Sequence, residues 1–162
     1  MEDEVDRLVR GWRTALPDTD VSPLEILSRV SRLARHLDRQ RAVIFARHEL
    51  AIWSFDVLSA LRRSDPPHHL SPGQLLAQTL VTSGTMTNRL DHLEGRGLVR
   101  RRPDPSDARS IRVHLTAAGR RRVDAALTEL IERENAILGT LDQDERAVLA
   151  GLLRRVVAPF DL

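Results

Sequence analysis

Cysteine, lysine and tyrosine are absent from the 162-residue chain, and aromatic residues make up only 3% of it. The lack of cysteine excludes disulfide bonds, thiol catalysis and cysteine-based zinc sites, and it fits a reducing cytosol, where we expect the protein to act. No apolar run approaches the roughly 18 residues of a membrane-spanning helix, and the acidic N-terminus is unlike a signal peptide. A length of 162 residues suits a single domain with a substantial core.

Motifs for catalysis or cofactor binding are missing as well. The sequence contains no glycine-rich phosphate loop, no serine nucleophile elbow and no paired-carboxylate motif. Two of the six histidines, His68 and His69, are adjacent in a proline-bounded loop, and the others are scattered without zinc spacing. We therefore expect no enzyme, no metal site and no cofactor, and we assign the histidines to loops and the surface.

Positive charge is concentrated in one part of the chain. All 25 basic residues are arginine, and the net charge is +2. Residues 86–122 contain ten arginines and four acidic residues, so the remainder is acidic overall. A local basic surface of this kind attracts the phosphates of a nucleic acid, and guanidinium suits bidentate phosphate contacts.

Two short helices are predicted just before and inside this basic segment. Ser71 followed by Pro72 is a helix start, because serine can accept from the first amides and proline loses no hydrogen bond there. That helix reaches about residue 78. Thr82 is well placed to cap a second helix, which ends near residue 94, where glycines follow. The apolar stripe of the second helix is formed by Met86, Leu90 and Leu93, at i, i+4 and i+7.

The side of the second helix opposite this stripe is small and polar. It presents Gly84, Asn88 and Asp91, with threonines and His92 on its shoulders. Such a face suits a helix in the DNA major groove, since small residues let the backbone approach while Asn88 and the threonines reach base edges or phosphates. The predicted DNA contacts on this helix are Thr82, Ser83, Thr85, Thr87, Asn88 and His92.

Residues 98–102 and 110–115 are predicted strands joined by a turn at 103–107, so the helix pair and the hairpin form a winged helix. Arg109 is the candidate for insertion into the minor groove, braced by Asp107, because a narrow groove attracts guanidinium. The alternative is an exposed turn whose charges are only solvated. The neighbouring arginines are expected to meet phosphates and to contribute affinity rather than sequence choice. They are Arg100, Arg102 and Arg112.

Apolar periodicity predicts five further helices, at residues 2–16, 24–46, 51–63, 117–138 and 142–157. The helix at 51–63 is apolar nearly all round, which is typical of a buried helix, and Asp56 lies in its middle. A carboxylate buried there would need a partner. The terminal helices carry more apolar surface than a thin winged helix covers, which indicates contact with a second subunit.

Four stretches of the sequence match one family pattern. They are residues 75–78 and 81–98, the wing string DPSDARS at 104–110 and LTAAG at 115–119. Together they resemble the MarR family of transcription regulators. The resemblance implies a mainly α-helical homodimer with a β-hairpin wing, in which residues 1–48 and 117–162 form the dimerisation region and 50–115 bind DNA. Two recognition helices would then meet successive major grooves of a pseudo-palindromic operator.

The resemblance extends to the urate-responsive branch of this family. Members of the branch carry a tryptophan in an extra N-terminal helix, an aspartate in the buried helix, an arginine in the recognition helix and a second arginine twelve residues later. The corresponding residues here, implied as ligand contacts, are Trp12, Asp56, Arg89 and Arg101. Trp53 is an alternative to Trp12, and Arg100 and Arg102 are alternatives to Arg101.

Helical geometry predicts the direction in which the Arg89 side chain points, independently of the family resemblance. It lies only about 60° from the Met86 stripe, whereas Asn88 lies about 160° away, so Arg89 should face its own protein. A buried Asp56 would be its natural partner. A planar anionic ligand, urate or a phenolic carboxylate, would stack near Trp12, pair with Arg89, displace Asp56 by repulsion and tilt the recognition helix. The alternative is a structural Asp56–Arg89 ion pair without a ligand.

The sequence thus predicts a ligand-responsive DNA-binding regulator, a repressor, acting as a homodimer. Two other classes stay open. A module that uses the winged helix to dock a partner protein would bind DNA weakly and without salt dependence. A winged-helix DNA binder without a ligand would show similar affinity for unrelated sequences.

Overall fold

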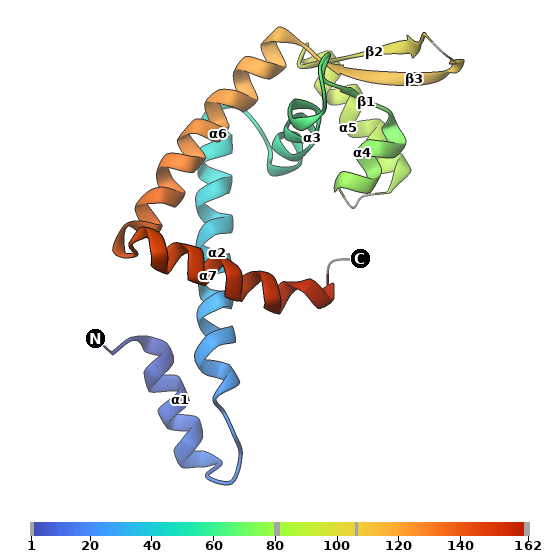
Figure 1. Cartoon of the computed structure of the whole chain (residues 1–162). Coiled ribbons are helices and arrows are strands. Elements are labelled where there is room, and N and C mark those ends of the chain that lie inside the picture. Colours follow the sequence, from blue (N-terminus) through green and yellow to red (C-terminus); the bar gives the residue numbers. More distant parts are fainter. Residues whose placement is uncertain (1, 80–81, 106, 161–162) are drawn as a thin grey trace. The chain divides into compact units, whose positions relative to one another are not determined.

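The computed structural model describes residues 2–79, 82–105 and 107–160, with the side chains of 107–109 outside the description. The chain is mainly α-helical, and within the described residues seven α-helices accompany a small three-stranded antiparallel sheet (Figure 1). This is the fold class that the sequence predicts. The backbone divides into two compact units, Met1–Ile52 and Trp53–Leu162. None of the described helices is both long and apolar enough to cross a membrane.

The first unit is a hairpin of two helices, α1 (Glu4–Ala15) and α2 (Pro23–Arg47), which lie side by side (Figure 1). Asp3 caps α1, because its carboxylate accepts from the amides of the first turn while Asp6 accepts from the Asp3 amide. Arg29 of α2 donates to both carboxylates and so ties α2 to the start of α1. The buried core of the hairpin consists of Val5, Val9 and Val21.

The second unit begins with three helices, α3 (Ile52–Arg63), α4 (Pro72–Thr79) and α5 (Ser83–Gly95). Ser71 starts α4 as predicted, since its hydroxyl accepts from the amide of Gln74 and the Gln74 carboxamide accepts from the Ser71 amide. The largest fully buried side chains of these helices are Leu58, Leu61, Leu75, Met86, Leu93 and Val57. These side chains form the buried apolar core of the second unit beneath α3 and α5.

A three-stranded sheet packs beside the helices, in the order β1 (His69–Leu70), β3 (Asp107–Leu115), β2 (Val99–Asp104), with both pairs antiparallel. Arg101 lies opposite the fully buried Val113, so it faces the helices. Side chains alternate along a strand, and Arg100 and Arg102 therefore face the other side of the sheet, together with His114. The two faces of the hairpin thus carry different arginines.

Two long helices follow the wing, α6 (Ala117–Ile137) and α7 (Gln143–Val157), with short 3₁₀ turns at Leu138–Thr140 and Ala158–Phe160. Thr116 caps α6 by accepting from the amide of Gly119. Gly119 must be glycine, because a Cβ there would lie 2.1 Å from the carbonyl oxygen of Leu98. The start of α6 is therefore pressed against the chain just before β2.

The predicted helices agree with the observed ones to within about two residues at their ends, which is the usual uncertainty of helix termini. Three local expectations need correction. Strand β1 was not predicted, because two residues leave no periodic pattern. Thr82 occupies the N-cap of α5, but its hydroxyl donates to the Thr85 hydroxyl, and no side-chain cap is made. Asp56 is exposed, on the side of α3 that also carries the exposed Ile52 and Arg63.

Candidate nucleic-acid interface

Helix α5 turns its apolar stripe into the protein and its polar face outward. Met86, Leu90 and Leu93 are buried at 2% exposure or less. The backbone of Gly84 is open, with no atom near the position of a Cβ. All side chains predicted on this helix to contact DNA are exposed, as the sequence requires; they are Thr82, Ser83, Thr85, Thr87, Asn88 and His92. Their contact with bases or phosphates remains a prediction.

Arg89 lies on one flank of α5 and meets an aromatic ring. Its guanidinium carbon is 5.3 Å from the centroid of the Trp53 ring, within the range of a cation–π interaction. The imidazole of His92, one helical turn further on, meets the same indole edge-on at a centroid distance of 5.6 Å. Trp53 of α3 thus contacts two residues of α5 at once.

Arg101 lies on the opposite flank of α5. Its Nε donates to Oε2 of Glu94 at 2.7 Å, its Nη2 lies 2.6 Å from Oδ1 of Asp91, and its backbone amide donates to Oε1 of Glu94 at 2.8 Å. These bonds hold the pKa of the Glu94 carboxyl below its usual range, first through the Arg101 amide and then through the guanidinium. The base of the wing is therefore tied to the C-terminal end of α5 by charge-assisted hydrogen bonds.

The outer face of the sheet is a cationic surface of a different kind. Arg100 and Arg102 are exposed and, with the segment His114–Ala117 at the junction of β3 and α6, line an open hollow of about 330 Å³. Arg112 on the same face is paired, since it donates to the Asp104 carboxylate and contacts Nε2 of His69 at 2.7 Å. Arg100 and Arg102 are thus better placed than Arg112 to meet a phosphate.

The histidines of this face stack on each other, with the ring centroids of His69 and His114 5.0 Å apart. Burial, followed by the nearby charges of His69, Arg102 and Arg112, holds the pKa of His114 below its ordinary value. No group of three or more His, Asp or Glu side chains suited to a metal ion occurs in the described part of the chain.

Known proteins share this arrangement. A model of the MarR family matches residues 48–110. The HTH-type transcriptional regulator PecS of Dickeya dadantii (strain 3937) is 35% identical over 153 residues, which are 94% of this chain and 92% of PecS. The chain belongs to the MarR family.

Two further relatives of this MarR-family chain extend the comparison. The HTH-type transcriptional repressor NicR of Pseudomonas putida (strain KT2440) is 29% identical, over 85% of this chain and 88% of NicR. The solved structure of Bordetella bronchiseptica BpsR, whose DNA binding is regulated by 6-hydroxynicotinic acid, is 27% identical with a TM-score of 0.58, over 79% of this chain and 98% of BpsR. The chain is accordingly a DNA-binding transcription regulator and not an enzyme.

Of the four residues implied as ligand contacts, Asp56, Arg89 and Arg101 belong to the second unit and Trp12 to the first. Arg89 contacts Trp53, and Arg101 is engaged by Glu94 and Asp91, so Arg101 serves as a brace in the protomer. Asp56 is exposed rather than buried, and its pairing with Arg89 remains a prediction. Trp12 is 46% exposed in α1, which belongs to the first unit.

The predicted pair at the wing tip lies outside the described side chains. The backbone of Asp107 and Arg109 belongs to β3, and β2 reaches Asp104, so the predicted turn at 103–107 and the predicted strand bounds at 102 and 110 are wrong: the hairpin strands extend further toward the tip. The bracing of Arg109 by Asp107 and its insertion into the minor groove stay predictions.

Sequence reasoning missed the carboxylates that engage Arg101 and gave Trp53 only second place. Glu94 stands seven residues before Arg101, across the glycine-rich turn, and that spacing gives no periodic signal. The signal for Trp53 was stronger, since a large aromatic side chain near the start of a mostly buried helix needs a neighbour with matching chemistry.

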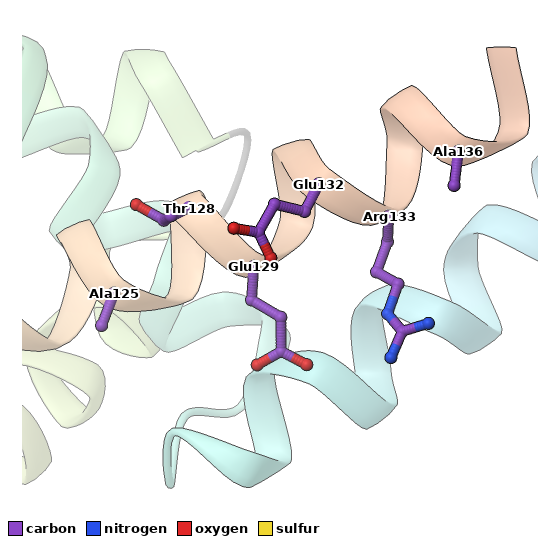
Figure 2. Close-up of a pocket in the computed structure, with 6 residues that line it drawn as sticks. All are labelled: Ala125, Thr128, Glu129, Glu132, Arg133 and Ala136. Atoms are coloured by element: carbon purple, nitrogen blue, oxygen red, sulfur yellow. The ribbon is translucent and has the colours of Figure 1, made fainter. Parts of the chain in front are cut away.

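Another hollow lies along α6 (Figure 2), with a volume of about 700 Å³. Figure 2 shows that side chains of both charge signs line it, with Glu129 and Arg133 projecting from α6 in the same direction and Glu132 in another. Two carboxylates against one guanidinium disfavour an anion, so this hollow does not suit the kind of ligand expected for this chain.

Proposed function

We propose that this MarR-family protein is a homodimeric repressor that a small anionic aromatic ligand, such as urate or a phenolic carboxylate, releases from its operator. The observation that carries the DNA-binding part is the exposed polar face of α5 beside an arginine-rich wing. Residues 50–115 would then form the DNA-binding region and 1–48 with 117–162 the dimerisation region. The similarity to the repressor NicR supports repression as the mode of action.

Dimerisation is supported by apolar side chains that stay exposed in the protomer. Along α7 and its end they include Val148 at 62% and Phe160 at 79% exposure. On α6, Leu127 and Ile131 are also exposed. Exposed apolar rows of this length on a helix favour a partner of the same chemistry, and a two-fold dimer is the commonest arrangement.

The ligand part rests on Arg89 and on the relatives. Arg89 is half-buried on the flank of α5, and its guanidinium lies over the Trp53 ring. A planar anion has both the charge and the flat face that such a pair accepts. The regulation of BpsR by 6-hydroxynicotinic acid, also a planar anion, supports the same ligand class.

Fluorescence anisotropy with the upstream intergenic DNA of the gene tests the proposal, with a scrambled duplex of equal length as control. We expect selective binding that weakens steeply with salt, as phosphate contacts require, and release on adding urate. Equal affinity for both duplexes would overturn the repressor function. Selective binding that neither urate nor a phenolic carboxylate changes would overturn only the ligand part.

The variant Arg89→Leu tests whether the urate response depends on Arg89. This variant should lose the urate response and still bind the operator selectively, with affinity weakened by at most about ten-fold, because Arg89 faces the protein rather than the bases. Asn88→Ala, on the exposed face of the same helix, should do the opposite and lose operator selectivity while keeping the urate response.

A further inference from the structure

We propose that Trp53 is a positioning residue, which holds one flank of the recognition helix through Arg89 and His92, while Arg101 holds the other. Loss of the Trp53 contacts alone would let α5 turn about its Arg101 side. The inference rests on the proposed function for its ligand step, in which an anion that captures Arg89 separates it from the indole. Trp53 thereby becomes the residue through which ligand binding reaches the DNA-binding face.

The positions of the contacts on α5 carry this inference. At about 100° per residue, Arg89 and His92 fall on one side of the Met86 stripe, while Asp91 and Glu94 fall on the other. Trp53 meets the first pair at 5.3 and 5.6 Å. Arg101 meets the second pair at 2.6 and 2.7 Å. The polar face that would enter the groove lies between these flanks, so its direction depends on both.

The supports behind the two contacts are themselves fixed. Trp53 stands at the start of α3, whose Val57, Leu58 and Leu61 are completely buried. Arg101 stands on β2, opposite the completely buried Val113. The apolar stripe of α5 between them fixes which side of the helix is buried. The contacts at the two flanks add directional restraints on either side of that stripe.

The two contacts differ in how a ligand could open them. Arg101 has two carboxylates close by, so a further anion would be repelled. Arg89 has an aromatic face, which a carboxylate or urate anion outcompetes as a partner for guanidinium because ionic hydrogen bonds are the stronger. A planar anion would thus separate Arg89 from Trp53 and leave the Arg101 side intact as a hinge.

A double-mutant cycle on operator binding without ligand tests the positioning role. Trp53→Leu keeps apolar volume but removes the π face, and we expect about three- to ten-fold weaker operator binding with unchanged binding to scrambled DNA. Arg89→Leu should add almost nothing to Trp53→Leu, since both remove one contact. Trp53→Phe should retain part of the affinity. Ile52→Ala, an exposed neighbour on α3, is the matched control and should leave affinity unchanged.

Either of two results would overturn the proposal: operator affinity of Trp53→Leu equal to that of the wild type, or fully additive effects of Trp53→Leu and Arg89→Leu. If Trp53→Leu fails to fold by circular dichroism, the cycle runs on Trp53→Phe and Arg89→Lys with the same criteria. A readout specific to the contact is the indole N–H resonance of Trp53, which should shift in Arg89→Leu and stay in Ile52→Ala.

A urate titration followed by the Trp53 indole resonance tests the ligand step separately. In the wild type, saturating urate should move the Trp53 indole resonance in the direction seen in Arg89→Leu. A urate-bound protein with an unmoved Trp53 resonance would overturn the ligand step. A protein that does not bind urate at all would refute the proposed ligand while the double-mutant cycle still decides the role of Trp53.

Discussion

Arg101 holds one flank of the recognition helix through charge-assisted hydrogen bonds to Glu94 and Asp91, whereas Trp53 holds the other through its ring against Arg89 and His92. A hydrogen bond to a charged group contributes about 1.5–3 kcal/mol, and a partly exposed cation–π contact about 0.5–1 kcal/mol. The wing side is therefore the stiff flank and the α3 side the soft one. If a ligand moves this helix as proposed, the α3 side should give way first, because its contact is the weaker.

The largest loss of stability should come from Gly119→Ala, because Gly119 packs against Leu98, just before the strand that carries Arg101. The new Cβ would lie 2.1 Å from the Leu98 carbonyl oxygen and 2.9 Å from Cδ1 of Leu115, so the start of β2 must shift. We expect the free energy of unfolding to fall by about 3 kcal/mol, measured by urea denaturation. Gly139→Ala, where a Cβ meets nothing within 4 Å, is the control, and an equal loss there would contradict the steric cause.

Next in size is Arg101→Ala, which removes the stiff flank directly. Glu94, a half-buried carboxylate, would lose its guanidinium partner but keep the hydrogen bond from the backbone amide of residue 101, and we expect a loss of about 2 kcal/mol in the free energy of unfolding. Operator affinity should fall more than in Trp53→Leu. Arg100→Ala, on the opposite face of the sheet, should leave stability within about 0.5 kcal/mol and lower the salt slope of DNA binding by about 1. Identical stability losses in the two variants would erase the distinction between the faces.

A smaller effect should appear in the pH dependence of the unfolding free energy, and only through the Glu94–Arg101 contact. Because the pKa of Glu94 in the folded chain is below its ordinary 4.5, its contribution to stability is complete above that value and is lost as the pH falls through the lowered pKa. Glu94→Gln should therefore show a flatter decline of unfolding free energy between pH 6 and pH 3. Trp53→Leu should keep the wild-type slope, since no carboxylate takes part in that contact. Parallel profiles for wild type and Glu94→Gln would show that this carboxylate does not couple to folding.

The smallest effect should come from Thr82→Ala at the first turn of the same helix. Thr82 donates to Thr85 and makes no side-chain cap, so removal of its hydroxyl should change the unfolding free energy by less than about 0.5 kcal/mol. Thr116→Ala at the start of α6 removes a real cap and should cost about 1 kcal/mol. Thermal denaturation of the pair compares them directly, and a larger loss at Thr82 would mean that α5 depends on its N-terminus more than on its flanks.

The sequence alone determined the helices, the winged-helix pattern and the polar face of α5, because 3.6-residue periodicity and local turn chemistry act over short distances. It also turned Arg89 toward the protein, since that follows from its angle to the Met86 stripe. Only the tertiary structure decided which side chains meet across elements. Trp53 and Arg89 are 36 positions apart in sequence, and Glu94 meets Arg101 across a turn, so neither contact leaves a periodic trace. The exposure of Asp56 was likewise not predictable from local pattern. Its apolar neighbours along the helix suggested burial, whereas tertiary packing left that side of α3 exposed. Helical periodicity gives the direction of a side chain about its own axis, and tertiary packing alone brings the neighbouring element to that side.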